Sequence, residues 1–338
     1  MLDLVDRTAP DLILVDLELH QHILPLRAQG RRLALLNTWL EIDPRSATLP
    51  LHLPISPDAA DAGRQAKRAW RRYQGAKKRR ALREWAREAG ADWRTSLLTL
   101  ARNNGLEIKA EIDFQSWLYP FSYRNIPILT LHAAELDYPR LPVTGSTFVG
   151  PMISPADDDV PWLEKFMTTG RPLVYAGFGS FFTASPNLVA AVFEALSQRP
   201  DWHLVFSLGG RPAPDLLPPP SNVRVIDWAP QTSILERADA AIIHGGINTI
   251  EECVQAKVPM IVYPQSVTDM PGNGARVAWN GFGEVGDPQD GAEALLARLD
   301  RVVASQDIAN RLAQASERLE RYRDDRVLEQ TINRLLTT

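Results

Sequence analysis

The sequence predicts an α/β protein built on two doubly wound, mostly parallel sheets. From residue 173 onward, short apolar runs alternate with helical patterns, which is typical of βα units on a parallel sheet. Before residue 150 the alternation is shorter and is interrupted by a Pro-rich stretch and a basic stretch. The 338 residues are enough for two domains, each with its own core.

Each expected element follows from its local pattern. Three apolar runs predict strands in the first half, and five predict strands in the second. Residues 44–62 are Pro-rich and irregular, 64–103 are helical and strongly basic, and 290–337 have the pattern of terminal helices. The predicted strands are Leu12–Val15, Leu33–Leu36, Ile128–Leu131, Leu173–Ala176, His203–Phe206, Val223–Ile226, Ala240–Ile243 and Met260–Val262, with a loop over Phe121–Pro127 and a run from Thr147 to Val149 that leads into Gly150-Pro151.

Composition excludes several classes of protein. A net charge of −4 gives no global basicity of the kind that binds nucleic acid. There is no apolar run long enough to span a membrane, and the first residues carry acids rather than the basic start of a signal peptide. The single cysteine, Cys253, excludes a disulfide within the chain. We therefore expect a cytoplasmic protein.

The most informative segment runs from Trp228 to Asn273. A buried strand ends there in a His-Gly-Gly turn, and Asn248 is the N-cap candidate of the helix that follows. Free backbone N–H groups, the positive end of the helix dipole and glycines together form an anion site at the carboxyl end of a parallel strand. A ligand bearing a diphosphate is the natural occupant.

This segment resembles the nucleotide-sugar motif of GT-B glycosyltransferases in the UDP-glycosyltransferase superfamily, especially bacterial macrolide and carotenoid glycosyltransferases. The family has a WxPQ motif, an HxGxNSxxE motif, and a GVPM-type run that leads to an Asp-Gln pair. Here these are matched by Trp228-Ala229-Pro230-Gln231, then His244, Gly246, Asn248, Thr249 and Glu252, then Val258-Pro259-Met260, Pro264 and Asp269. The resemblance implies two Rossmann-like domains, with the N-terminal one truncated.

The resemblance also implies a role for each of these residues. Trp228 would stack on a uracil or thymine, and hydroxyls of the sugar would bond to Asp269, with Met270 beside it. No metal and no cofactor is expected. The nucleotide would contact Trp228, Ala229, Gln231 and Glu252, and the diphosphate would contact Gly179, Ser180, His244, Gly246, Asn248 and Thr249.

The sequence departs from the family pattern at two places near the expected donor sugar and at one place that concerns catalysis. Met270 replaces the family's Gln, and the loop from Pro264 to Asp269 is one residue longer. Family members begin with a Gly-His-x-x-Pro loop whose His is the general base, and no such loop precedes Asp16. Asp16 aligns with the Asp that orients that His. Three explanations stay open: a shortened gene product, one subunit of a split enzyme, and a degenerate protein that binds nucleotide without catalysis.

The resemblance implies a domain order. Residues 1–150 would form a partial acceptor-binding domain, 151–170 a linker, 171–305 the donor domain, and 306–338 C-terminal helices. A doubly wound domain without its first strands exposes a strand edge and an apolar face. We therefore expect a partner chain or self-association to cover it.

Two further patterns have competing interpretations. Alternation along Asp16, Glu18, His20 and His22 would place four metal-ligand types on one face of a strand, whereas the simpler interpretation is a strand end followed by a helix. The basic stretch 64–87, with interleaved Trp and Tyr, suits either an anionic membrane surface or a solvated helix beside the acceptor cleft.

The expected reaction is inverting transfer of a sugar from a UDP- or dTDP-sugar to a hydroxyl of a hydrophobic small molecule or lipid. A catalytically impaired nucleotide-sugar-binding protein, or one subunit of a split glycosyltransferase, is the alternative. A sugar-nucleotide epimerase of the same fold is a third reading, disfavoured by WxPQ together with HGGxNT.

Overall fold

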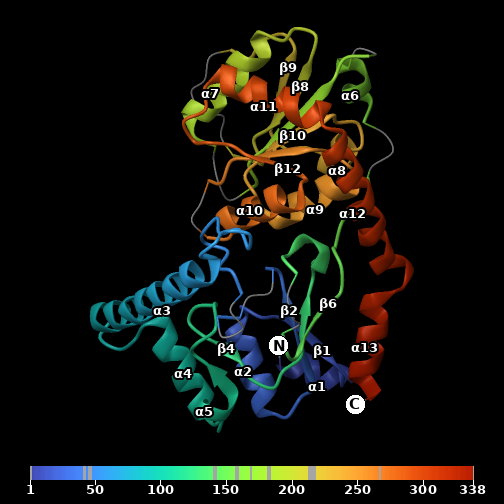
Figure 1. The fold of residues 1–338 in the computed structure, drawn as a ribbon. Coiled ribbons are helices and arrows are strands. Elements are labelled where there is room, and N and C mark those ends of the chain that lie inside the picture. Colours follow the sequence, from blue (N-terminus) through green and yellow to red (C-terminus); the bar gives the residue numbers. More distant parts are fainter. Residues whose placement is uncertain are drawn as a thin grey trace.

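The computed structural model describes two sheets, one above the other in Figure 1, with the C-terminal helices running beside both. We call residues 2–149 the N-terminal unit and the remainder up to residue 304 the C-terminal unit. The structure describes residues 2–40, 43–44, 48–139, 143–156, 160–167, 170–180, 184–211, 218–265 and 268–337.

The N-terminal unit has a four-stranded parallel sheet of order β1-β2-β5-β6. A separate two-stranded antiparallel ladder joins β3 to β4. The elements are α1 (Leu2–Thr8), β1 (Ile13–Asp16), α2 (His20–Ala28), β2 (Leu33–Asn37), α3 (Ala62–Arg87), α4 (Trp93–Asn103), α5 (Ile108–Glu111), β3 (Ile112–Asp113), β4 (Ser122–Tyr123), β5 (Ile128–Thr130), a 3₁₀ turn η1 (Ala134–Leu136) and β6 (Ser146–Phe148).

Alternation along β2 explains how this sheet is packed on both faces. Leu33 and Leu35 point into a core shared with α2 and α4, whereas Ala34 and Leu36 point to the opposite side. The sheet is therefore the middle of three layers.

The C-terminal unit has a six-stranded parallel sheet of order β12-β11-β10-β7-β8-β9. Strand order reverses beside β7, which places a topological switch point between β7 and β10. The elements are α6 (Pro161–Phe166), β7 (Leu173–Gly177), α7 (Pro186–Ser197), β8 (His203–Ser207), β9 (Val223–Ile226), α8 (Gln231–Leu235), β10 (Ala240–Ile243), α9 (Ile247–Gln255), β11 (Met260–Val262), α10 (Met270–Asn280), β12 (Gly283–Val285) and α11 (Ala292–Ala304).

The last two helices connect the units. Helix α12 (Gln306–Asp324) packs against α9, and α13 (Val327–Thr337) continues down to the N-terminal sheet (Figure 1). There Leu328, Ile332 and Leu335 cover the Ala34 side of the sheet. The expectation of an exposed apolar face is therefore wrong for this side, because the chain's own C-terminus covers it. Among the strands that the structure describes, β1 pairs with β2 alone and forms the edge of the sheet, and Leu14 on that strand is 38% exposed.

The strands agree well with the sequence, and the corrections are local. Every predicted strand is confirmed within a residue or two, but β3, β6 and β12 were not predicted, and the three residues of β12 include a glycine. The basic stretch is two helices, broken where Ala89 and Gly90 adopt positive φ angles. The predicted loop at Phe121–Pro127 contains β4, and the predicted linker contains α6. Parts of that linker, 157–159 and 168–169, lie outside the described residues.

None of the described helices is both long enough and apolar enough to cross a membrane.

Candidate functional site

The predicted anion site is a cradle of glycines at the carboxyl ends of β7, β8 and β10. Gly179 follows β7 and Gly209 follows β8, both with positive φ angles, and a side chain on Gly209 would collide with the carbonyl of Gly179. The chain can pass this closely only because these residues lack Cβ atoms. Gly246 completes the cradle as the N-cap of α9, whose first N–H groups face it.

His244 is the side chain that the cradle surrounds. A methyl group on Gly246 would approach its Nε2 to 2.5 Å, and one on Gly179 would approach it to 2.9 Å. Burial lowers the pKa of His244, and the carbonyl of Gly177 and the charge of Asp269 oppose the shift. The ring is therefore neutral near pH 7 and donates through one nitrogen. The predicted position of His244 beside a diphosphate site agrees with this geometry.

Asn248 does not cap the helix, in contrast to the expectation. Gly246 occupies the N-cap, no side chain caps α9, and Asn248 lies exposed in the first turn. A glycine occupies the N-cap position because the backbone approaches the ring of His244 there so closely that a side chain would collide with it.

Gln231 links the predicted nucleotide residues into one network. Its amide donates to the hydroxyl of Thr249 at 3.2 Å and to the carboxylate of Glu252, and its carbonyl accepts from Tyr175 at 2.6 Å. Thr249 accepts this bond and keeps its own proton to donate. Burial raises the pKa of Glu252, the bond from Gln231 opposes the shift, and the charge of Glu251 adds to it.

Trp228 lies at the rim of this network. Trp228 is 70% exposed, which is the largest exposed fraction among the large apolar residues that the structure describes. The ring packs beside Gly210, whose absent side chain leaves room for it. Ala229, next along the chain, is buried. An exposed aromatic face of this kind can serve as a stacking surface for a planar ring.

Asp269 is buried and held in a fixed position beside the His-Gly-Gly turn. Thr268 donates to one carboxylate oxygen at 3.0 Å, and Asn273 donates to the other at 2.8 Å. Asn273 also donates to the carbonyl of Gly245 at 2.9 Å, so one amide ties the predicted sugar acid to the predicted phosphate turn. Met270 is buried at the start of α10. Residues 266–267 of the longer loop lie outside the described residues.

The remaining diphosphate candidates lie on the β7 side of the cradle. Ser180 is exposed, and Arg211 donates to its carbonyl at 2.7 Å. The side chain of Arg211 thereby brings a cation to the rim of the cradle. Sequence reasoning missed Arg211, Tyr175 and Asn273. Arg211 could have been found from the sequence, because it follows the Gly209-Gly210 pair, which is separated by two residues from the end of a predicted strand.

Asp16 ends β1, and its carboxylate accepts from the backbone N–H of Glu18 at 2.8 Å. No described histidine is bonded to it. His20 begins α2 and points into an aromatic cluster, where its Nδ1 lies 2.8 Å from the hydroxyl of Tyr123. Burial and then the charge of Lys77 lower the pKa of His20 to about 4.

The metal interpretation of this segment is wrong, because the strand ends at Asp16 and alternation stops there. Among the residues that the structure describes, no group of three or more His, Cys, Asp or Glu side chains could hold a metal ion.

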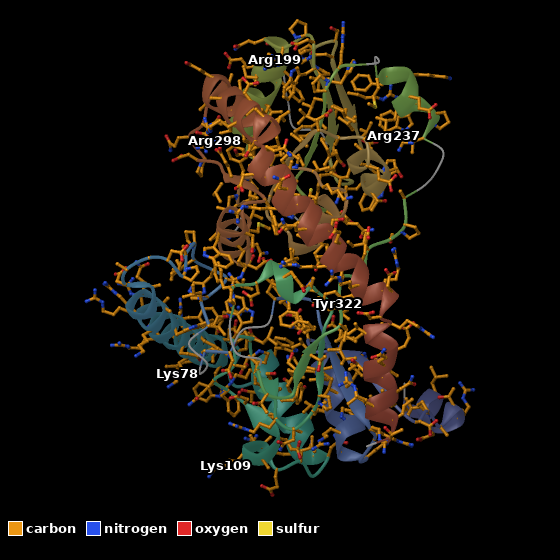
Figure 2. The ribbon with its side chains drawn as sticks, turned by 45° about the vertical axis from the view of Figure 1, so that its right-hand side comes forward. Lys78, Lys109, Arg199, Arg237, Arg298 and Tyr322 are labelled. Carbon is orange, nitrogen blue, oxygen red and sulfur yellow. The ribbon has the colours of Figure 1, made fainter. Side chains whose placement is uncertain are left out.

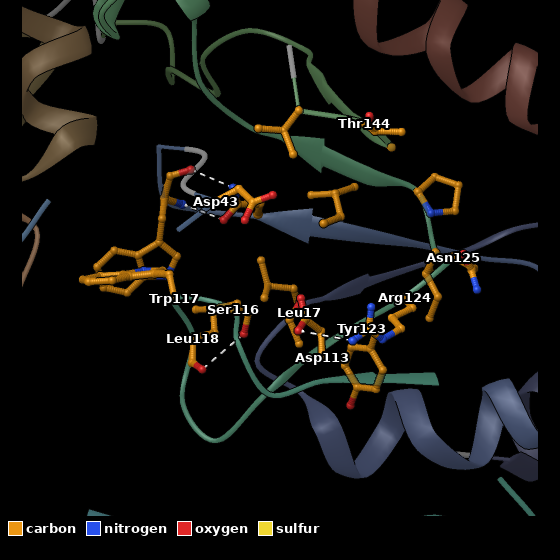
Figure 3. Close-up of a pocket in the computed structure, with 18 of the residues that line it drawn as sticks. Leu17, Asp43, Asp113, Ser116, Trp117, Leu118, Tyr123, Arg124, Asn125 and Thr144 are labelled. Carbon is orange, nitrogen blue, oxygen red and sulfur yellow. Dashed lines mark hydrogen bonds and ion pairs between the residues drawn. The ribbon is translucent and has the colours of Figure 1, made fainter. Parts of the chain in front are cut away.

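The N-terminal unit contains a cavity of about 440 Å³ (Figure 3). Its walls come from segments far apart in sequence: the end of β2, the loop before β4, and the turn between β5 and β6. Trp117 and Leu118 lie on one side of the cavity in Figure 3, and Arg124 lies toward the other, 3.6 Å from the carboxylate of Asp113. The lining is mixed, with apolar walls and charged groups at separate places.

The two units meet at a tightly bonded surface, which we call the seam. Arg276 of α10 donates to Asp137 at 2.7 Å, and the backbone N–H of Gly272 donates to the carbonyl of Leu51 at 2.7 Å. His132 lies 3.0 Å from Glu251 of α9, which also accepts from the N–H of Ala133. Helix α12 adds Tyr322, placed between the units in Figure 2 and bonded to Glu135.

Comparison with known proteins places this geometry in a family. Residues 123–307, more than half of the chain, match the family model described as UDP-glucoronosyl and UDP-glucosyl transferase. The chain belongs to this UDP-glycosyltransferase family. The matched range contains the whole cradle, the Gln231 network and the seam residues of the C-terminal unit.

Individual relatives agree with this family assignment. The chain is 30% identical to oleandomycin glycosyltransferase of Streptomyces antibioticus over 172 residues, which is 47% of this chain and 39% of that protein. It is 26% identical to zeaxanthin glucosyltransferase of Pantoea ananas over 184 residues, or 53% of this chain and 42% of that protein. The chain thus spans about two fifths of the length of these curated relatives.

The solved structures establish the fold. The glycotransferase of kitacinnamycin superposes with a TM-score of 0.68 at 22% identity, covering 98% of this chain and 77% of that one. The two sheets therefore correspond to the two Rossmann-like domains of the GT-B fold, which agrees with the predicted fold class. The domain boundaries at 150, 170 and 305 stay predictions.

Proposed function

We propose that this chain binds a UDP- or dTDP-sugar in the C-terminal unit and serves in inverting transfer of the sugar to a hydroxyl of a hydrophobic acceptor. One observation supports this most. The glycine cradle, His244 and the first turn of α9 form an anion site, and the Gln231–Glu252 network and Trp228 lie beside it. A nucleoside diphosphate has a diphosphate, a ribose and a planar base in the same order, which would meet the anion site, the Gln231–Glu252 network and Trp228.

The chemistry follows from the positions of these groups. When the sugar leaves the diphosphate, negative charge develops on the leaving oxygens, and the N–H groups of α9 and His244 would stabilise it. Glu252 and Gln231 would bond the ribose hydroxyls, exchanging their mutual contact for contacts with the ligand. Asp269, already fixed by Asn273, would accept from a hydroxyl of the sugar.

We assign the acceptor to the cavity of the N-terminal unit. Trp39, Leu40 and Trp117 offer it apolar walls, and Leu40 also belongs to the apolar cluster that includes Ile247 and Ile250 of α9. The cavity therefore adjoins the seam, on the other side of which lies the helix that carries the donor residues. An acceptor with a rigid apolar body and a hydroxyl at one end suits this lining.

The decisive experiment is calorimetric titration with UDP and with dTDP. Trp228→Ala should weaken binding by about 1–3 kcal/mol through loss of the stacking surface. Because Trp228 is largely exposed, the thermal midpoint should hardly change. Trp85→Ala, an exposed tryptophan on α3, is the matched control and should bind like the wild type. Equal affinity in all three proteins would refute the donor site.

A second candidate function is nucleotide-sugar binding without independent transfer, with the base supplied by a partner chain. Asp16 favours it, since its carboxylate contacts a backbone N–H and no described histidine. A placed base is typically worth about 10²–10⁴ in rate. An assay of UDP-glucose with phenolic, macrolide and carotenoid acceptors separates the candidates. Ordinary enzymes turn over about 10 times per second. Transfer by this chain at a rate within tenfold of that value would exclude the second candidate function.

A further inference from the structure

The positive charge of this protein is concentrated in one helix. Of the 37 basic and 41 acidic residues in the chain, 11 basic residues and one acidic residue, Glu84, lie in α3. The helix therefore carries a net charge of +10, and the rest of the chain carries −14. A net charge of −4 for the whole molecule conceals this separation.

The positive charges of α3 are concentrated on the face that points away from the protein. Ala66, Ala69, Trp70 and Lys77 form its buried face. At 100° per residue, the opposite face carries seven exposed cations and no acid. Glu84 lies on the inner side and is paired with Arg80. The seven outward cations are Arg64, Lys67, Arg68, Arg71, Arg72, Lys78 and Arg79. None of them forms an ion pair with an acidic side chain that the structure describes, because the described ion pairs of this helix involve Arg80 and Arg87 instead.

Two large apolar side chains share this outward face. Leu82 is 65% exposed and Trp85 is 53% exposed, one helical turn apart at the C-terminal end of α3. A solvated helix beside a cleft gains nothing from exposing them. A helix with cations along its length and a Trp and a Leu on the same side has the pattern of helices that lie in a membrane interface.

The position of α3 leaves this face accessible. Helix α3 projects from the side of the N-terminal unit in Figure 1, and Lys78 lies at the margin of the molecule in Figure 2. The axis of a helix of 26 residues extends over about 39 Å. The acidic remainder of the chain would be repelled by the same surface that attracts α3, which favours one orientation.

We propose that the outward face of α3 docks this protein on an anionic lipid bilayer. The cations would lie among the lipid phosphates, and Leu82 and Trp85 would enter the boundary between headgroups and acyl chains. The apolar pair favours lipid over nucleic acid, because a phosphodiester backbone offers no apolar medium for Leu82. This inference does not depend on the proposed transferase function.

The test is co-sedimentation of the full chain with vesicles of phosphatidylcholine, with and without 30% phosphatidylglycerol. Binding should require the anionic lipid and should fall as salt rises from about 50 to 500 mM, because screening shortens the range of the charges. Replacing Arg68, Arg71, Lys78 and Arg79 by Gln should lower the partition coefficient about a hundredfold or more, since each cation near such a surface contributes severalfold.

A matched control removes the same charge elsewhere. Gln in place of Arg311, Arg318, Arg321 and Arg323, which are exposed on α12, should leave the partition coefficient within about threefold of the wild type. A second variant, Leu82→Ser with Trp85→Ser, should lower binding at high salt more than at low salt, because it removes only the apolar contribution.

The outcomes distinguish the possible partners. Equal binding to neutral and anionic vesicles, or equal loss in the α3 and α12 variants, would overturn the proposal. Displacement from the vesicles by a structured RNA at equal phosphate concentration would overturn it as well, and would identify a nucleic-acid surface. UDP titration of the α3 variant should match the wild type, which separates this result from failure of the donor site.

Discussion

The two sheets of this protein differ in how their functional groups are assembled. In the C-terminal unit, one stretch from Trp228 to Asn273 supplies most of the candidate donor site, and the loops after β7 and β8 complete it. In the N-terminal unit, the cavity draws its walls from residues spread between Leu17 and Gly145. The first kind of site can be recognised in a sequence, and the second cannot.

The difference also concerns what holds each unit together. The six-stranded sheet is packed on one face by α7 and α11 and on the other by α8, α9 and α10. The four-stranded sheet relies on α13, which arrives from the far end of the chain. The N-terminal unit therefore depends on the seam and on the C-terminal helices. Two of the three predictions below test that dependence at the seam, and one tests the interior of the N-terminal unit.

Loss of the buried ion pair at the seam should have the largest effect. Arg276→Ala would leave Asp137 buried without its cation, which typically costs about 3–5 kcal/mol. We expect the free energy of unfolding, measured with urea, to fall by this amount. Hydrogen exchange should show faster opening in the N-terminal unit than in the C-terminal unit.

Arg298→Ala is the control, because Arg298 pairs with Glu284 and Asp290 in a partly exposed setting within the C-terminal unit. It should cost about 1 kcal/mol or less. Equal losses in the two variants, or uniform exchange across both units, would contradict the view that the seam supports the N-terminal unit in particular.

Acid should destabilise the N-terminal unit through His20. The pKa of this residue falls from 6.5 to about 4 on folding, so between these values the unfolded state binds more protons and stability decreases as pH falls. The loss at pH 5 should be about 2 kcal/mol relative to pH 7. Urea titrations at both pH values should show this difference in the wild type and a smaller one in His20→Phe.

His22→Gln is the control for His20, since His22 lies two residues further along the same helix and is only partly buried. It should keep the full pH dependence. If His20→Phe and the wild type lose the same stability at pH 5, the effect belongs to another group.

The smallest expected effect comes from the other buried pair of the seam. Burial opposes the protonation of His132, but the bond and charge of Glu251 outweigh it, so the pKa of His132 is raised. The stabilisation is therefore complete below the unfolded value of about 6.5 and is lost as pH rises through the raised folded value. Glu251→Gln should remove this dependence and cost about 1 kcal/mol at pH 6.

Glu135→Gln is the matched control for this pair, because Glu135 also lies at the seam but bonds to Tyr322 rather than to a histidine. Its unfolding free energy should follow the same pH profile as the wild type. A flat profile between pH 6 and pH 9 in the wild type would show that His132 does not titrate in this range.

The sequence by itself determined most strands of both sheets and the order of the candidate donor residues. Buried parallel strands are short apolar runs, and an anion site at a helix N-terminus needs only a turn, glycines and the residues next to them. Those interactions are local in sequence. His244, Gly246 and Thr249 could therefore be proposed for this site from the order of the motif and its resemblance to the family, whereas their contacts with Gln231 and Gly179 were seen only in the structure.

Only the tertiary structure decided the packing between distant segments. That α13 covers the N-terminal sheet, that Arg276 reaches Asp137, and that His20 turns into an aromatic cluster rather than toward Asp16 depends on packing between segments far apart in the chain. Apolar burial is not directional, so a helical pattern shows which side is buried but not what covers it. The physical partner of each apolar face is fixed only when the whole chain has folded.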